Sequence, residues 1–165
     1  MDDGTNGEYS RPPEPKDVID LCRSLNEQGV RYMLIGGFAV VLYGFGRFTK
    51  DIDLLVDTSI ENILKLKKAL ASLPDNAISL MENDELEKYK VVRIADEFVI
   101  DLMAKACGIN FEEAFKTVEY KTVHDIQIPV PSKETLIRMK DTIRLSDKID
   151  ADFLKSEIER EKKGK

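Results

Sequence analysis

The sequence is poor in the residues that build zinc sites and disulfide frameworks. Its 165 residues include one histidine and two cysteines, Cys22 and Cys107, which lie far apart in the chain. Two distant cysteines cannot form a disulfide framework, and with one histidine they supply too few ligands for a Cys/His zinc site. We expect both cysteines to be reduced thiols in the core.

The sequence also lacks a hydrophobic run long enough to cross a membrane. The longest stretch without a charge, residues 32–46, has fifteen residues and contains four glycines, whereas a helix needs roughly 18 to 20 apolar residues to span a bilayer. The first residues, MDDGTNGEYSRPPEP, have neither the basic start nor the apolar segment of a signal peptide. We therefore predict a cytoplasmic protein with no membrane partner.

A surplus of positive charge is missing as well. Lys and Arg number 25 against 31 Asp and Glu, a net charge of −6, which argues against a protein that coats nucleic acid by bulk charge. The length and the 42% hydrophobic content fit one domain. Residues 1–15 hold three of the six prolines, so we predict a flexible N-terminal tail there and a single domain over residues 16–165.

The hydrophobic pattern predicts an α+β domain with a mixed β-sheet flanked by helices. Apolar residues at helical spacing predict a helix that begins at residue 16 and ends at Gly29, and short apolar runs with turn residues between them predict strands. Ser59, Asn110 and Ser132 are predicted N-caps. The expected strands are residues 32–35, 51–56, 89–95, 98–103, 118–123 and 126–130, and the other expected helices are residues 38–43, 60–73, 111–117, 133–145 and 147–160.

Two acids stand at the start of one predicted strand, in Asp51-Ile52-Asp53. Alternate side chains of a strand point to the same face, so these carboxylates should lie about 6.5 to 7 Å apart along it. Their repulsion would be offset by a divalent cation, and hard oxygen ligands suit Mg²⁺ or Mn²⁺. The alternative is a strand that simply starts in an acidic loop.

A pair of glycines follows the first predicted strand, in Ile35-Gly36-Gly37. Glycines allow the backbone to approach a ligand closely, and the N–H groups of a following helix favour phosphate. The pattern is neither a Walker loop nor the dinucleotide fingerprint GxGxxG. The alternative is a tight turn with close helix packing.

A third acid, Asp101, lies inside the apolar run FVIDLM. An acid within a buried strand must be paired, hydrogen-bonded or bound to metal. Asp96 and Glu97 fall in the predicted turn before this strand, where we expect them to be merely solvated. Asp101 is therefore the stronger candidate for a site.

Taken together, these motifs resemble the DNA polymerase beta-like nucleotidyltransferase superfamily. The matching residues are IGG, a gap of thirteen residues, DIDL, and later IDL. The stretch YGFGRFTKDIDLLV is similar to small bacterial nucleotidyltransferase proteins, including toxins of toxin–antitoxin pairs. The resemblance covers about residues 30–145.

The resemblance implies a nucleotidyltransferase fold in which Asp51, Asp53 and Asp101 bind Mg²⁺ or Mn²⁺ and carry catalysis. Gly36 and Gly37 would cradle the triphosphate of an NTP, although the superfamily often has serine where Gly37 stands. Two metal ions about 3.5 to 4 Å apart can clamp an in-line displacement at phosphorus, and Asp101 could take the proton of the attacking hydroxyl. The acceptor could be a protein, a tRNA or a small molecule, and an antitoxin-like partner is implied. The alternative is a catalytically silent nucleotide-binding or interaction protein that retains the fold.

The negative charge of a bound triphosphate requires nearby cations. We predict that the nucleotide-binding cations are Arg47, Lys50, Lys140 and Arg144. On the predicted Ser132-capped helix, Lys140 and Arg144 are four residues apart and would share one face. The alternative is a solvated basic face that pairs with Asp141 or Asp147.

Overall fold

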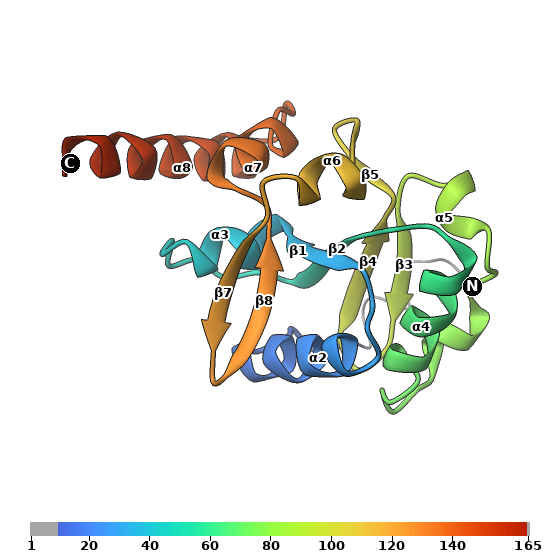
Figure 1. Cartoon of the computed structure of the whole chain (residues 1–165). Coiled ribbons are helices and arrows are strands. Elements are labelled where there is room, and N and C mark those ends of the chain that lie inside the picture. Colours follow the sequence, from blue (N-terminus) through green and yellow to red (C-terminus); the bar gives the residue numbers. More distant parts are fainter. Residues whose placement is uncertain (1–9, 165) are drawn as a thin grey trace.

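A four-stranded mixed sheet forms the centre of the protein, whose computed structural model describes residues 10–164 (Figure 1). Its strands are β1 (Tyr32–Ile35), β2 (Asp51–Val56), β3 (Val92–Ala95) and β4 (Val99–Met103), in the order β1-β2-β4-β3. β2 and β4 are parallel, whereas β1 and β3 are antiparallel to their neighbours. The predicted α+β class with a mixed sheet is confirmed.

Helices lie on both sides of this sheet. Figure 1 shows α2 (Pro15–Glu27) below it, α4 (Ile60–Leu70) at its lower right and α6 (Phe111–Phe115) above it, and α2 packs against α4. The hairpin of β7 (Glu119–Val123) and β8 (Ile126–Val130) stands beside β1. The remaining elements are α3 (Gly36–Leu42), η1 (Ala77–Leu80), α5 (Glu85–Lys88), β5 (Lys105–Ala106), β6 (Ile109–Asn110), α7 (Lys133–Met139) and α8 (Leu145–Lys163).

The predicted helix starts are confirmed by capping geometry. The side chains of Ser59, Asn110 and Ser132 accept hydrogen bonds from backbone N–H groups of the first helical turn, at 3.3, 2.9 and 3.2 Å. Such caps satisfy donors that have no partner inside the helix. The apolar face predicted for α2 is buried and consists of Val18, Leu21, Cys22 and Leu25.

The predicted helix ends are less accurate. α4 and α6 each end a few residues early, and the helix predicted over residues 133–145 stops at Met139. Lys140 leaves the helix and turns its ammonium group toward Asp147 and Asp150 of α8. The ion pairs of Lys140 thus accompany the end of α7, and they join residues seven and ten positions apart in the chain.

Part of the predicted N-terminal tail is docked. Residues 1–9 lie outside the described residues, but Ser10 Oγ donates a hydrogen bond to the carbonyl of Asp96 at 2.8 Å. The backbone N–H of Arg11 donates to the carbonyl of Glu97, and its guanidinium lies 5.5 Å from the centre of the Phe98 ring. Ser10 and Arg11 thus lie against the β3–β4 turn, where the sequence predicted part of a loose tail.

The two cysteines differ in their surroundings. Cys22 is fully buried in the core, as predicted, whereas Cys107 is exposed in a turn with a positive φ of 47°. The prediction that both are core thiols is wrong for Cys107. Among the described residues, no helix has both the length and the apolar character needed to cross a membrane.

Candidate active site

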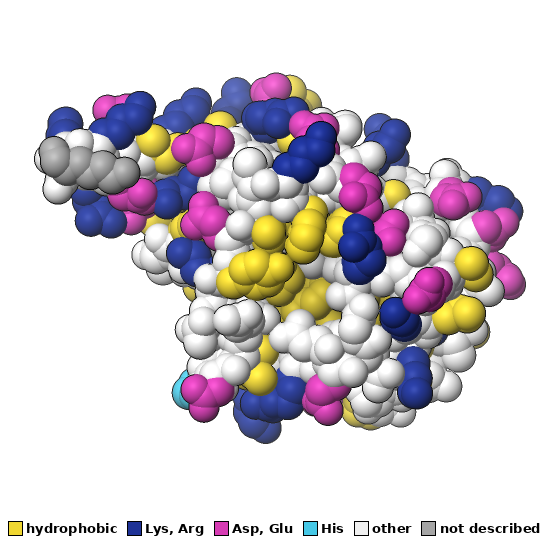
Figure 2. Space-filling view, viewed as in Figure 1, with side chains coloured by type: hydrophobic (Ala, Val, Ile, Leu, Met, Phe, Trp, Pro, Cys, Tyr) yellow, Lys and Arg dark blue, Asp and Glu magenta, His cyan; other side chains and the backbone are white. Residues whose placement is uncertain are grey.

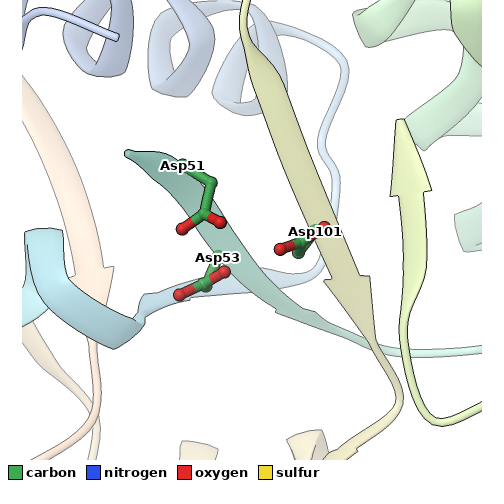
Figure 3. A group of neighbouring side chains, drawn as sticks. All are labelled: Asp51, Asp53 and Asp101. Atoms are coloured by element: carbon green, nitrogen blue, oxygen red, sulfur yellow. The ribbon is translucent and has the colours of Figure 1, made fainter. Parts of the chain in front are cut away.

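Three aspartates converge on one face of the sheet. Asp53 and Asp101 lie directly opposite each other in the parallel β2–β4 register, and Asp51 stands two residues before Asp53 on the same face. One carboxylate oxygen from each residue lies within 4.8 Å of the other two, and Figure 3 shows the side chains pointing toward one another. The structure therefore brings together the three acids that the sequence singled out.

The environment of these acids disfavours their charged forms. Burial, together with the neighbouring charges of Asp51 and Asp101, raises the pKa of Asp53 to about 7. Burial and the charge of Asp101 also raise the pKa of Asp51. Lys140 and Arg144 partly offset the effect on Asp53. The cluster is thus short of positive charge, as expected of a cation site.

Arg93 completes the cluster and was missed by the sequence analysis. It lies on β3 directly opposite Asp101, and its Nε and Nη2 donate to the two oxygens of Asp101 at 2.9 and 3.0 Å. A longer contact of 3.4 Å joins Nη2 to Asp51 Oδ2. The loop between the strands is residues 96–98, one residue longer than the predicted turn, and a shift of one residue in a strand exchanges its faces. The correct register would have identified Arg93.

The two glycines pack against the site. Gly36 has a φ of 69°, and a Cβ there would overlap the carboxylate of Asp53. A Cβ on Gly37 would lie 2.5 Å from Cγ2 of Thr49 and 3.3 Å from Nη1 of Arg47. Glycine is therefore required at position 36, because its φ favours glycine and a Cβ there would overlap the carboxylate of Asp53. At Gly37 the absence of a side chain allows the close approach of Thr49.

The predicted cations are largely occupied by ion pairs with α8. Nη1 of Arg47 lies 2.6 Å from Asp150, and Nζ of Lys140 lies 2.9 Å from the same carboxylate oxygen. Arg144 pairs with Asp147 at 2.8 Å. Lys50 is exposed. The structure thus links Arg47, Lys140 and Arg144 through two acids of one helix.

Two expectations about Lys140 are wrong. It does not share a helix face with Arg144, because Lys140 follows α7 and Arg144 precedes α8. It is also not on a solvated face, since 8% of the residue is exposed. The expected pairing with Asp147 is present, together with a pair to Asp150.

The sequence analysis did not single out Asp150 and gave Asp147 only a surface role. Both are almost fully buried, at 1% and 2% exposure. Burial alone would raise the pKa of Asp147, but hydrogen bonds from Arg144 and Thr142 hold it below its usual range. Asp147 and Asp150 are three residues apart and share a helix face with the apolar Ala151 and Leu154. This spacing could have indicated from the sequence that the two acids are buried.

A separate hollow lies away from the acids, near the start of β1. In Figure 2 it is the apolar depression at the centre of the face, and its walls include Tyr32, Phe111, Phe115 and Tyr120. Arg31 stands at its edge, 4.9 Å from the centre of the Phe111 ring. The hollow is thus distinct from the site at the other end of β1, where Gly36 and the three acids meet.

This arrangement of a mixed sheet, a glycine turn and three converging acids defines the class of the protein as a nucleotidyltransferase fold. A candidate nucleotidyltransferase from Thermotoga maritima has 15% sequence identity, with a TM-score of 0.54 over 88% of this chain and 92% of that one. The lincosamide antibiotic adenylyltransferase LnuA, with lincomycin bound, has 21% identity and a TM-score of 0.55 over 88% of this chain and 99% of that one. At such identities the similarity shows the fold.

The sequence comparison gives the family. Residues 19–143 match the nucleotidyl transferase AbiEii toxin family of type IV toxin–antitoxin systems, and the chain belongs to that family. No curated protein matches the sequence. The predicted resemblance to the nucleotidyltransferase superfamily is confirmed, and the protein is a nucleotidyltransferase.

Proposed function

We propose that the protein transfers a nucleoside monophosphate from an NTP to an acceptor hydroxyl, with a divalent cation held by Asp51, Asp53 and Asp101. The observation that carries this proposal is the convergence of three carboxylates from two neighbouring strands. Burial and the neighbouring carboxylates raise the pKa values of Asp51 and Asp53, and a cation that joins the acids would offset that repulsion. The family supplies the reaction class.

The donor set fits Mg²⁺ or Mn²⁺. Each acid offers a hard carboxylate oxygen, and the three oxygens lie within 4.8 Å of one another, close enough for shared ligation. When bound, such a cation would stabilise negative charge on the phosphates and on the attacking and leaving oxygens.

The side chains around the acids suit the other requirements of the reaction. The acceptor oxygen would form a bond to the α-phosphorus, while the bond to the β-phosphate breaks and pyrophosphate leaves with the electron pair. We assign the proton of the acceptor hydroxyl to Asp101. Arg47 and Arg144 lie beside the glycine turn and the acids, and we assign them, with Gly36 and Gly37, to the triphosphate.

The toxin family suggests the consequence of this reaction. A nucleotidyl group placed on an acceptor that a cell needs for growth would inactivate that acceptor, and an antitoxin partner would counter the effect. Expression of the wild type in bacteria should therefore slow growth, whereas the Asp53→Asn variant at equal protein level should not. Equal inhibition by both proteins would contradict a toxic effect that depends on transfer.

The direct test is label transfer from each of the four NTPs to the components of a bacterial lysate. We expect labelling by the wild type with Mg²⁺ or Mn²⁺, its loss with EDTA, and its loss in Asp53→Asn. The matched control is Asp20→Asn, which changes a surface aspartate of α2 that pairs with Lys16 and Arg23. If the wild type labels nothing and its stability is indifferent to Mn²⁺ with nucleotide present, the silent fold is favoured instead.

A further inference from the structure

One guanidinium is hydrogen-bonded to two of the three acids. Arg93 donates two hydrogen bonds, side by side, to both oxygens of Asp101 and a third to Asp51. In residues 10–164, all hydrogen bonds from cations to the three acids come from Arg93. Lys140 and Arg144 act on Asp53 through their charges but form their ion pairs with Asp147 and Asp150 instead.

The strand register places this guanidinium in a row with the acids. Arg93, Asp101 and Asp53 are successive cross-strand neighbours on β3, β4 and β2. An opposite charge directly across a strand pair is favourable, and like charges so placed repel. Arg93 therefore supplies the positive charge that makes the meeting of the acids tolerable when no metal is bound.

We propose that Arg93 is an exchangeable counterion that competes with the divalent cation for Asp101 and Asp51. The inference rests on the metal site of the proposed function. Metal binding needs inward-facing lone pairs of these carboxylates, and the two-pronged contact with Arg93 engages both oxygens of Asp101. A dication beside a guanidinium also meets a like charge. Metal binding therefore displaces the guanidinium of Arg93 from the acids.

The position of Arg93 allows this exchange. Its side chain is 55% exposed, whereas that of Asp101 is 8% exposed. β3 is the edge strand of the sheet, so the guanidinium can turn outward into water without unpacking the core. Lys140, by contrast, is held in a buried ionic network and cannot exchange so easily.

The alternative is a fixed positioning role, in which Arg93 stays on Asp101 and orients it for the metal. The two roles predict opposite effects of removing the guanidinium. If Arg93 competes, metal should bind more tightly without it. If Arg93 orients Asp101, metal should bind more weakly.

The test is Mn²⁺ binding without nucleotide, measured by calorimetry on the wild type and Arg93→Gln. We expect about five-fold tighter binding in Arg93→Gln, which corresponds to about 1 kcal/mol for a partly exposed ion pair. Arg93→Lys, which keeps the charge but not the two-pronged geometry, should fall between them. Arg23→Gln, which removes an arginine paired with Asp20 within α2, should bind like the wild type. Unchanged or weaker binding in Arg93→Gln overturns the proposal.

Asp53→Asn separates this inference from the proposed function. If the wild type binds Mn²⁺ and Asp53→Asn does not, the metal site stands whatever Arg93 does. If neither the wild type nor Arg93→Gln binds, the metal site and the exchange fail together. If Arg93→Gln binds Mn²⁺ and the wild type does not, Arg93 blocks the metal site completely, and the exchange is supported.

A second measurement uses the unaltered chain. In a Mg²⁺ titration followed by the ¹⁵N signals of arginine Nε–H groups, one signal should move as the hydrogen bond to Asp101 is lost. That signal is assigned by its absence in Arg93→Lys. A signal of Arg93 that stays unchanged while Mg²⁺ saturates the site would contradict the exchange.

Discussion

At the scale of single residues, Asp53 is partly buried, lies close to the like charges of Asp51 and Asp101, and packs against Gly36. Its pKa of about 7 lies well above the usual value of an aspartate, about 3.9 in unfolded chains. Between these two values the folded protein binds more protons than the unfolded chain. The free energy of unfolding of the metal-free protein therefore falls as the pH rises from about 4 to about 7, and this contribution then levels off.

Replacing Asp53 by Asn should remove most of this pH dependence. We expect the urea midpoint of the wild type in EDTA to fall more between pH 5 and pH 8 than that of Asp53→Asn. At pH 8 the variant should be as stable as the wild type or more stable. Because metal binds the deprotonated acid, Mn²⁺ should stabilise the wild type at pH 8 more than at pH 5. Parallel pH profiles of the two proteins in EDTA would contradict the assignment.

Asp96 shows what sequence reasoning missed at this scale. It was expected to be solvated in a turn, yet it is 3% exposed and accepts hydrogen bonds from the backbone N–H groups of Asp75, Ala77 and Glu97. Two of these donors lie about twenty residues away, beyond the reach of any local pattern. Asp101, in contrast, was found because an acid inside an apolar strand is conspicuous in the sequence itself.

At the scale of elements, α8 holds the cations of the site. Asp147 and Asp150 bind Lys140, Arg47 and Arg144, while Phe153 stacks on Phe45 with ring centres 4.6 Å apart. One face of α8 therefore fixes both the loop before β2 and the turn after α7.

Lys140→Ala should consequently lower stability, because it leaves two buried carboxylates with fewer counter-charges. We expect a loss of about 3 kcal/mol in the free energy of unfolding, measured by denaturant titration. Lys148→Ala, an exposed lysine of α8, should stay within about 0.5 kcal/mol of the wild type. The double variant Lys140→Ala/Asp150→Asn should lose less than the sum of its single changes. A Lys140→Ala protein as stable as Lys148→Ala would refute the structural role.

The elements were predictable where a local signal sets them. Caps at Ser59, Asn110 and Ser132 and the apolar spacing of α2 act within a few residues, so helix starts and the strands of the sheet were found. The end of α7 at Met139 was not predicted, and the three-residue loop between β3 and β4 shifted the register of Arg93. The three acids and the nearby cations Lys140 and Arg144 were therefore predicted from sequence, whereas Arg93, which hydrogen-bonds to the acids, was not.

At the scale of the whole molecule, the segment before α2 ties the N-terminal side to the β3–β4 turn. Arg11 pairs with Asp17 at 2.6 Å and with Glu97 at 2.8 Å, and Pro13 is buried. The segment thus joins parts of the chain that lie more than eighty residues apart.

Removing residues 1–9 should leave the melting temperature unchanged, since the contacts of Ser10 and Arg11 remain. Removing residues 1–14 should lower it by about 2 to 5 °C, the effect of about 1 kcal/mol on a domain of this size. Thermal unfolding followed by circular dichroism measures both. Arg11→Gln, which keeps the segment but weakens its ion pairs, should lie between them, and equal melting temperatures for the two truncations would show that the segment adds nothing.

The dependence of the cations on α8 also has a consequence during synthesis. A ribosome makes the glycine turn first, then the three aspartates and Lys140, and makes Asp150 about fifty residues after Asp101. A nascent chain that stops short of α8 carries all the acids, but its cations lack the helix that holds them in place. The cations around the three acids would therefore reach their final arrangement only late in translation, once α8 has been made.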